Sequence, residues 1–332
     1  MSVSNTSSSS QPQPLKITRS QWSQMLDALV AQHHVIGPKT EGSHYTFDRV
    51  TERQQIALVH DRTQCPIRTI FMPGELIGPE QARKIPAEKQ LILLGLHPCD
   101  VRALAAMDRY LIDEAQCRPY AELRKRTLVI GYNCLPDEQC HCRGPWNQFA
   151  APDFDLTFTD IGFECVVRVG SEAGGKLLEQ FGFAQPLTDS SSEVLWAMNF
   201  QCMDKMMYHL RESRTEKALQ QHEPAELIRE LVPACADIPD TFDVCPTNFP
   251  PAAGESPEQL VQSNLQPLSC RIADDLLGEV RRCYGEVLRR YKVAACVGCG
   301  RCLAACPDSI AVPFVFLLKR VAEQAAQAAK AT

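Results

Sequence analysis

Four cysteines near residue 300 have a spacing that is typical of metal ligation. The segment reads Cys296-Val-Gly-Cys299-Gly-Arg-Cys302-Leu-Ala-Ala-Cys306-Pro307, which is the C-x2-C-x2-C-x3-C-P pattern that holds a [4Fe-4S] cubane through thiolates. Gly298 and Gly300 permit the tight backbone turns that such wrapping requires. The alternative is structural zinc, but zinc normally uses two well-separated cysteine pairs. We predict a [4Fe-4S] cluster at this C-terminal cysteine motif (residues 296–307).

The fourth ligand of this cluster has two candidates. In two-cluster ferredoxins, the cysteine before the proline serves the other cluster, and a remote Cys-Pro completes the first. Cys245-Pro246 is such a remote pair, so either Cys306 or Cys245 is the fourth ligand. If Cys306 is left over, a second cluster there would need Cys202, Cys235 and Cys270, whose spacings match no tight motif.

A second group of cysteines follows two apolar segments in the first half of the chain. Cys99 follows the segment 90–96, and Cys134, Cys140 and Cys142 follow the segment 127–131. Adjacent parallel strands deliver their carboxyl-terminal loops to one edge of a sheet, so these four thiols (the N-terminal cysteine set) are candidates for another [4Fe-4S] cluster. The alternative is that Cys99 is a buried apolar residue and the others are incidental loop thiols.

The remaining candidates for chemistry are weaker. Single cysteines in apolar or helical contexts are expected to be core or surface thiols; they are Cys65, Cys117, Cys165 and Cys283. The histidines at 33, 34, 60 and 97 show no metal-ligand spacing, and His141 is expected to be exposed or to support a ligand. The sequence shows no Ser/His/Asp constellation, and no G-x-G-x-x-G segment follows a predicted strand. The glycines of 170–175 fit a helix-entry turn better than a phosphate loop.

The elements that would position the N-terminal cysteine set belong to a mixed α/β layer. Apolar spacing predicts a helix over 20–35 with Ser20 as N-cap, and short β-branched segments predict strands at 45–50, 56–58 and 67–71. Strands are also expected at 90–96, 127–131 and 165–169, with helices over 101–112, 120–126 and 176–181. Buried strands that end in reactive loops are typical of such layers.

The second half of the chain has a different character. From residue 191 the strand signal disappears and helical patterns take over, interrupted by a Pro- and Asp-rich connection at 233–257. We therefore predict a disordered tail over 1–14, a mixed α/β domain over 15–190 and a mainly helical ferredoxin-type domain over 191–332. Two domains also agree with a length of 332 residues, since one domain averages ~150.

Composition excludes several classes of function. The formal charge of −6 from 34 basic and 40 acidic residues disfavours a nucleic-acid partner. No apolar segment reaches the ~18 residues of a membrane span, and the polar residues 1–15 do not resemble a secretory signal. We expect a cytoplasmic protein. Its 16 cysteines then favour metal binding over disulfides, which are rare in reducing compartments.

Several segments, taken in order, resemble one known family. They are Ile36-Gly-Pro38, Leu94-Gly-Leu-His-Pro-Cys99-Asp100, Tyr120–Arg126 before Thr127-Leu-Val-Ile-Gly131, Asn133-Cys134, Cys140-His-Cys142, Asp153-Phe-Asp155-Leu-Thr-Phe-Thr-Asp160 and Cys296–Pro307. Together they resemble the iron–sulfur subunit that soluble sulfhydrogenases, as their beta subunit, share with anaerobic sulfite reductases. The resemblance extends over residues 15 to 320.

This resemblance implies a mixed N-terminal domain and a helical domain with two ferredoxin-type motifs. It implies electron transfer between a flavin-containing NAD(P)H-oxidising subunit and a catalytic redox subunit, with no catalytic residues in this chain. The sequence departs from the family where the first ferredoxin motif should follow Trp196, because only Cys202 remains and Cys245-Pro246 is the remnant of its end. The rival interpretations are a zinc-stabilised interaction module and a stand-alone oxidoreductase that acts at the N-terminal cysteine set.

Overall fold

The structure is a computed structural model of the 332-residue chain. It describes residues 13–71, 85–86, 88–114, 116–134, 136–137, 140, 154–205, 297–301 and 304. The predicted tail therefore falls almost wholly outside the described residues. Of the predicted helical domain, residues 206–296 and most of 302–332 lie outside them as well, so that domain and its boundaries remain a prediction.

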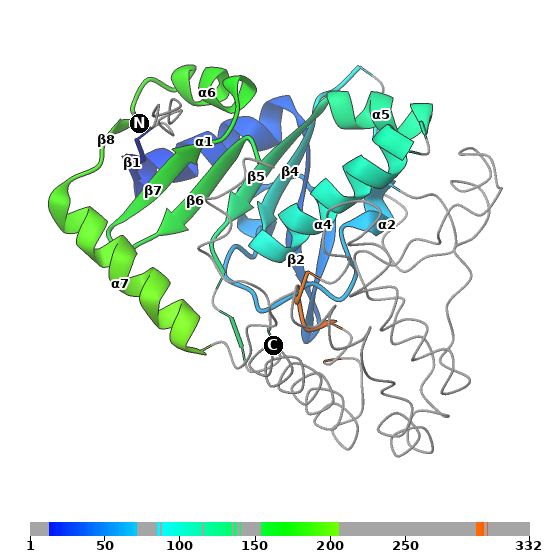
Figure 1. The fold of residues 1–332 in the computed structure, drawn as a ribbon. Helices are drawn as coiled ribbons and strands as arrows, with labels where there is room; N and C mark the ends of the chain where they lie inside the picture. Colours follow the sequence, from blue (N-terminus) through cyan, green and yellow to red (C-terminus); the bar gives the residue numbers. More distant parts are fainter. Residues whose placement is uncertain are drawn as a thin grey trace, which may run out of the picture.

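Eight strands form one mixed sheet (Figure 1). They are β1 (Leu15–Thr18), β2 (His34–Glu41), β3 (His44–Val50), β4 (Leu91–Leu96), β5 (Thr127–Tyr132), β6 (Leu156–Asp160), β7 (Glu164–Val169) and β8 (Gln185–Pro186). Their order is β3-β2-β4-β5-β6-β7-β1-β8. The central strands β2, β4, β5 and β6 run parallel, and the flanking strands pair antiparallel.

Helices and helical turns cover both faces of the sheet. They are α1 (Arg19–Gln32), η1 (Arg53–Gln55), α2 (Arg68–Phe71), α4 (Pro98–Asp108), the π-helical η2 (Arg109–Glu114), α5 (Arg118–Lys125), α6 (Glu172–Glu179) and α7 (Asp189–Lys205). Figure 1 shows α4 and α5 in front of the sheet and α1 behind it. The described chain is thus a three-layer α/β/α arrangement.

Strand β4 shows how the two layers of core are built. Leu91 and Leu93 pack into the cluster on the α4 side, whereas Ile92 and Leu94 pack into the cluster on the α1 side. All four side chains are fully buried. A central parallel strand is covered on both faces, which explains why its sequence is continuously apolar rather than alternating.

An irregularity at Gly95 shifts the pairing of β4 with β5 between Leu94 and Leu96. Gly95 has a φ of 74°, and a Cβ at this position would lie 2.9 Å from Cδ of Pro38. Only glycine tolerates this combination of positive φ and close approach. Beyond the shift, Leu96 joins Leu91 and Leu93 on the α4 side, so the alternation of the strand changes by one residue just before Cys99.

Helix α1 differs at its ends from the sequence prediction. Its N-cap is Thr18, not Ser20: the Thr18 hydroxyl accepts from the Gln21 N–H, and the Gln21 side chain accepts from the Thr18 N–H. This reciprocal capping box satisfies two backbone donors. The helix stops at Gln32 because His34 and Val35 pair in β2 beside β4.

Two of the predicted short strands are absent from the described residues. The segment 67–71 is helical instead, since Thr69 N–H donates to the carbonyl of Pro66 and Ile70 N–H to that of Ile67. All four residues of α2 are buried, so this segment lacks the alternation of buried and exposed side chains that marks a half-exposed strand. The segment 56–58 forms no strand either, although Ala57 N–H donates to the Pro38 carbonyl at 2.7 Å.

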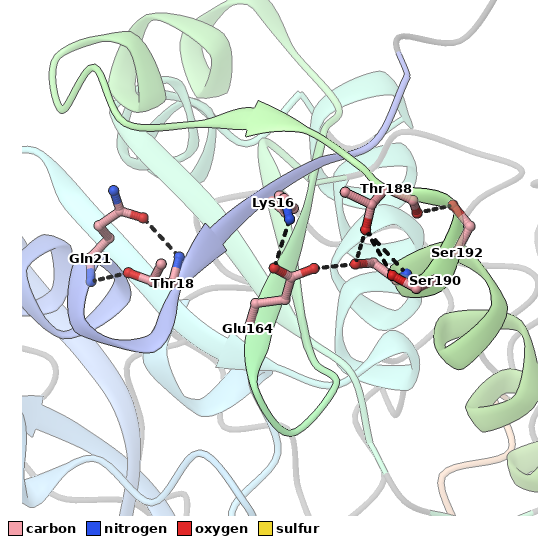
Figure 2. A network of polar contacts seen from close by, with 8 residues as sticks. Lys16, Thr18, Gln21, Glu164, Thr188, Ser190 and Ser192 are labelled. Carbon is pink, nitrogen blue, oxygen red and sulfur yellow. Dashed lines mark hydrogen bonds and ion pairs between the residues drawn. The ribbon is translucent and has the colours of Figure 1, made fainter.

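A buried carboxylate fixes the point where α7 begins (Figure 2). Glu164 of β7 pairs with Lys16 of β1 at 3.1 Å, and it accepts a hydrogen bond from the Ser191 hydroxyl. Thr188 and Ser192 add turn contacts at the start of the helix. The first turn of α7 is therefore held against the sheet.

Candidate metal centre

The carboxyl ends of β4 and β5 place two cysteines of the N-terminal cysteine set at one edge of the sheet. The two strands are parallel neighbours, as expected from the sequence. Cys99 lies in the first turn of α4, whose N-cap is His97, and Cys134 follows β5 by two residues. Both cysteines are partly buried. We call this edge, with its two loops, the cysteine edge.

Cys140 is tied to the same region through Arg62. The Cys140 N–H donates to the carboxylate of Asp137 at 3.1 Å, and Arg62 forms an ion pair with that carboxylate. The Arg62 guanidinium also lies 3.9 Å from the Cys140 sulfur. A positively charged donor is thus placed beside one predicted ligand.

The described part of the C-terminal cysteine motif packs directly on the cysteine edge. Figure 1 shows residues 297–301 in orange beside the loop that follows β3. Val297 and Cys299 are buried in the core cluster of α4, against which Cys99 also packs. Gly298 and Gly300 have φ values of 69° and 72°, which fits the tight turning predicted for them. The sequence indicated two separate cysteine sites and gave no sign of this contact between them.

Arg301 is the buried link between these segments. It is 3% exposed, and its guanidinium lies 2.8 Å from the fully buried carboxylate of Asp100. It also donates to the carbonyl of Thr63 at 2.9 Å and to the Thr63 hydroxyl at 2.8 Å. Burial acts to lower the pKa of Arg301, but Asp100 and the sulfurs of Cys299 and Cys99 raise it above its ordinary value. The guanidinium is therefore charged in this position.

Two histidine rings stack beside the same site. His60 and His97 have ring centroids 4.0 Å apart and an interplanar angle of 15°. Nδ1 of His60 donates to the carbonyl of Ala57 at 2.9 Å. Burial lowers the pKa of both histidines, and the charge of Arg301 lowers it further, so the two stacked rings are neutral. The sequence spacing gave no sign of this pair.

The other predicted ligands lie outside the described residues. These ligands are Cys142, Cys245, Cys296, Cys302 and Cys306. The weaker candidates His141, Cys235, Cys270 and Cys283 also lie outside the described residues, as does the side chain of Cys202. Within the described residues, no group of three or more His, Cys, Asp or Glu side chains is arranged to hold a metal ion. The ligand sets therefore remain predictions.

Three of the single cysteines, which the sequence predicted to be core or surface thiols, lie in the core. Cys65, Cys117 and Cys165 are 5%, 0% and 1% exposed. Burial raises the pKa of the Cys65 thiol, and it raises the pKa of Cys165 to about 12. Protonated buried thiols of this kind behave as small apolar side chains.

The surroundings of the cysteine edge fit an iron–sulfur cluster. Sulfurs of such clusters accept N–H hydrogen bonds that tune their potential. Nη1 of Arg301 is buried without a hydrogen-bond partner among the described residues. Both Asp100 oxygens also lack a hydrogen bond there, because their contact with Arg301 is an ion pair without hydrogen-bond alignment. A donor left in this state beside Cys299 and Cys99 is suited to an additional sulfur acceptor.

Signals for the missed residues existed in the sequence. Arg301 lies between two cysteines of the motif, and Asp100 directly follows Cys99 at the start of a mostly apolar helix. A charge in such a position needs a partner when it is buried. Thr63 and Arg62 carry no comparable signal, because their contacts join residues that are 238 positions apart.

Fold and site together define an α/β domain whose strand ends carry cysteines and receive a cysteine-rich segment from the other end of the chain. The sequence is similar to "Sulfhydrogenase 2 subunit beta" of Pyrococcus furiosus, with 28% identity over 144 residues. The match covers 42% of this chain and 43% of that protein. It supports a relation to sulfhydrogenase beta subunits. No protein-family profile matches the sequence.

Among the described helices, none is both long and apolar enough to cross a membrane. The longest of them, α7, has 17 residues.

Proposed function

We infer that the protein is an electron-transfer iron–sulfur subunit of a cytoplasmic redox complex of the hydrogenase or sulfite reductase type. Its partners would be a flavoprotein that oxidises NAD(P)H and a catalytic redox subunit, and the chain itself would carry no catalytic residue. The observation that carries this proposal is the contact between the two cysteine groups, because a relay needs redox centres that lie near each other. The similarity to a sulfhydrogenase beta subunit supports it.

The proposed ligands follow the sequence patterns. The C-terminal cluster would be held by Cys296, Cys299 and Cys302 with Cys306 or Cys245, and the N-terminal cluster by Cys99, Cys134, Cys140 and Cys142. Each bound cluster would supply reversible one-electron chemistry. The residues of this chain do the rest: α4 and its neighbours exclude water from Cys299, and Arg62 and Arg301 place positive charge beside the sulfurs.

Metal content tests this proposal. Protein purified without oxygen is expected to contain about four to eight irons per chain with equal sulfide, since each cubane has four of each. It should be brown and lose its visible absorption on reduction with dithionite. Stoichiometric zinc without sulfide would contradict the proposal and support the zinc-stabilised interaction module.

Partner capture tests the proposed role in a complex. The tagged full-length chain, isolated from its native host without oxygen, is expected to retain a flavoprotein and a second redox subunit. In that complex, NAD(P)H should bleach the clusters of this chain. Turnover of a small substrate by the isolated chain with an artificial electron donor would instead support a stand-alone oxidoreductase.

A further inference from the structure

One arginine in the C-terminal cysteine motif reaches both cysteine groups. Arg301 lies two residues after Cys299, which is buried in the cluster against which Cys99 packs, and its guanidinium lies 2.8 Å from the carboxylate of Asp100. Its ion-pair partner Asp100 directly follows Cys99 and is 0% exposed. A buried ion pair of this kind is costly to break, because removing one partner leaves an uncompensated buried charge.

A second arginine makes the reciprocal connection. Arg62 belongs to the sheet domain, and it donates to the carbonyl of Gly300 in the motif at 3.2 Å. The same guanidinium forms an ion pair with Asp137 and lies beside the Cys140 sulfur. Each segment therefore supplies one arginine that holds the other segment. Thr63, next to Arg62, accepts both hydrogen bonds from Arg301.

The depth of this contact distinguishes it from a surface ion pair. The side chains of Arg301 and Asp100 are 2% and 0% exposed, whereas those of Arg53 and Asp27 are 34% and 57% exposed. Water and salt screen exposed pairs strongly and buried pairs much less. A charge at Arg301 therefore acts on both neighbouring sulfurs with little screening.

We propose that Arg301 is a positioning residue that docks the C-terminal cluster onto the N-terminal cluster and sets the potentials of both. This inference rests on the proposed function, since it requires both clusters. Reduction adds one negative charge to a cluster. The positive charge of Arg301 favours that reduced state, and the negative charge of Asp100 opposes it. The ion pair thus couples two redox centres that belong to opposite ends of the chain.

The test is an EPR-monitored redox titration of the full-length, cluster-loaded protein and three variants. Arg301→Gln should lower both potentials, and Asp100→Asn should raise both. We expect each shift to be about tenfold in the one-electron equilibrium constant, which corresponds to about 59 mV. Arg301→Lys keeps the charge but loses the fork that reaches Thr63, so its shift should be smaller than that of Arg301→Gln. The matched control Arg53→Gln should leave both potentials unchanged.

A purely structural role cannot produce shifts of opposite sign from the two members of one ion pair. Magnetic interaction between the two reduced clusters in the parent protein is also expected, and it should be absent from a variant that holds one cluster. If Arg301→Gln does not retain iron, Asp100→Asn and Arg301→Lys carry the test.

Two results separate this inference from the proposed function. If both clusters are present, but the Arg301 and Asp100 variants leave the potential of the N-terminal cluster unchanged, the proposed effect of this ion pair on both clusters is refuted. The electron-transfer role then stands. If the parent protein contains no iron and sulfide, both proposals fall together. A parent protein with both clusters reduced and no magnetic interaction between them also overturns the coupling.

Discussion

The described cysteines occupy two contrasting regions of the molecule. In the core, Cys117 and Cys165 are at most 1% exposed, and burial keeps the Cys165 thiol protonated with a pKa of about 12. At the cysteine edge, Cys99 and Cys299 share the neighbourhood of the Arg301 guanidinium, and Cys140 lies beside Arg62. The difference teaches that burial alone does not define a cysteine's role. Positive charge from Arg301 or Arg62 beside the sulfur distinguishes Cys99, Cys299 and Cys140 from Cys117 and Cys165, although Arg301 also acts on the buried Cys65.

The largest effect is expected from Cys299→Ser, compared with Cys165→Ala. The first variant should lose about four irons per chain, because one cubane loses a thiolate. It should also melt at a lower temperature, since metal-binding energy is partly folding energy. Iron analysis and thermal unfolding without oxygen measure both. Cys165→Ala should keep its iron, and unchanged iron and melting in Cys299→Ser would remove Cys299 from the ligand set.

A smaller effect on stability is expected from Cys99→Ala or Cys142→Ala, compared with Cys117→Ala. Each of the first two should also lose about four irons, but the eight-stranded sheet beneath the cysteine edge should keep its fold without metal. Iron content and circular dichroism check these outcomes. Loss of iron from Cys117→Ala, or full iron in Cys142→Ala, would break the distinction between core thiols and ligands.

The smallest effect concerns pH and the core region. The Cys165 thiol titrates at an ordinary 9.0 when unfolded and at about 12 when folded. Above pH 9 the unfolded chain releases a proton that the folded chain keeps, so the free energy of unfolding should fall as pH rises from 9 toward 12. The slope from this thiol is at most about 1.4 kcal/mol per pH unit. Urea midpoints of the parent protein and Cys165→Ala at about pH 8 and about pH 10 measure it; equal slopes in the two proteins would contradict the assignment.

Local elements of this structure could be predicted from the sequence, whereas its long-range contacts could not. The strands predicted at 90–96 and 127–131 correspond to β4 and β5, and their parallel pairing places Cys99 and Cys134 at one edge. The strand predicted at 67–71 is wrong: residues 68–71 are helical, and all four are buried, so their apolar content does not distinguish helix from strand. Pairing of Arg301 with Asp100 joins positions far apart in the chain, and no local spacing encodes such a contact.

Gly95 is an extra residue in β4, and the faces on which the residues between it and Cys99 lie depend on it. Side chains of a strand alternate between faces, so one added or lost residue exchanges the faces for everything that follows. A chain of the same length in which residue 95 paired regularly with β5 would retain every cysteine. It would nevertheless turn Leu96 to the α1 layer, because Leu96 would then share the face of Ile92 and Leu94. The surroundings of Cys99 therefore depend on the irregular pairing at Gly95 as well as on the identity of the ligands.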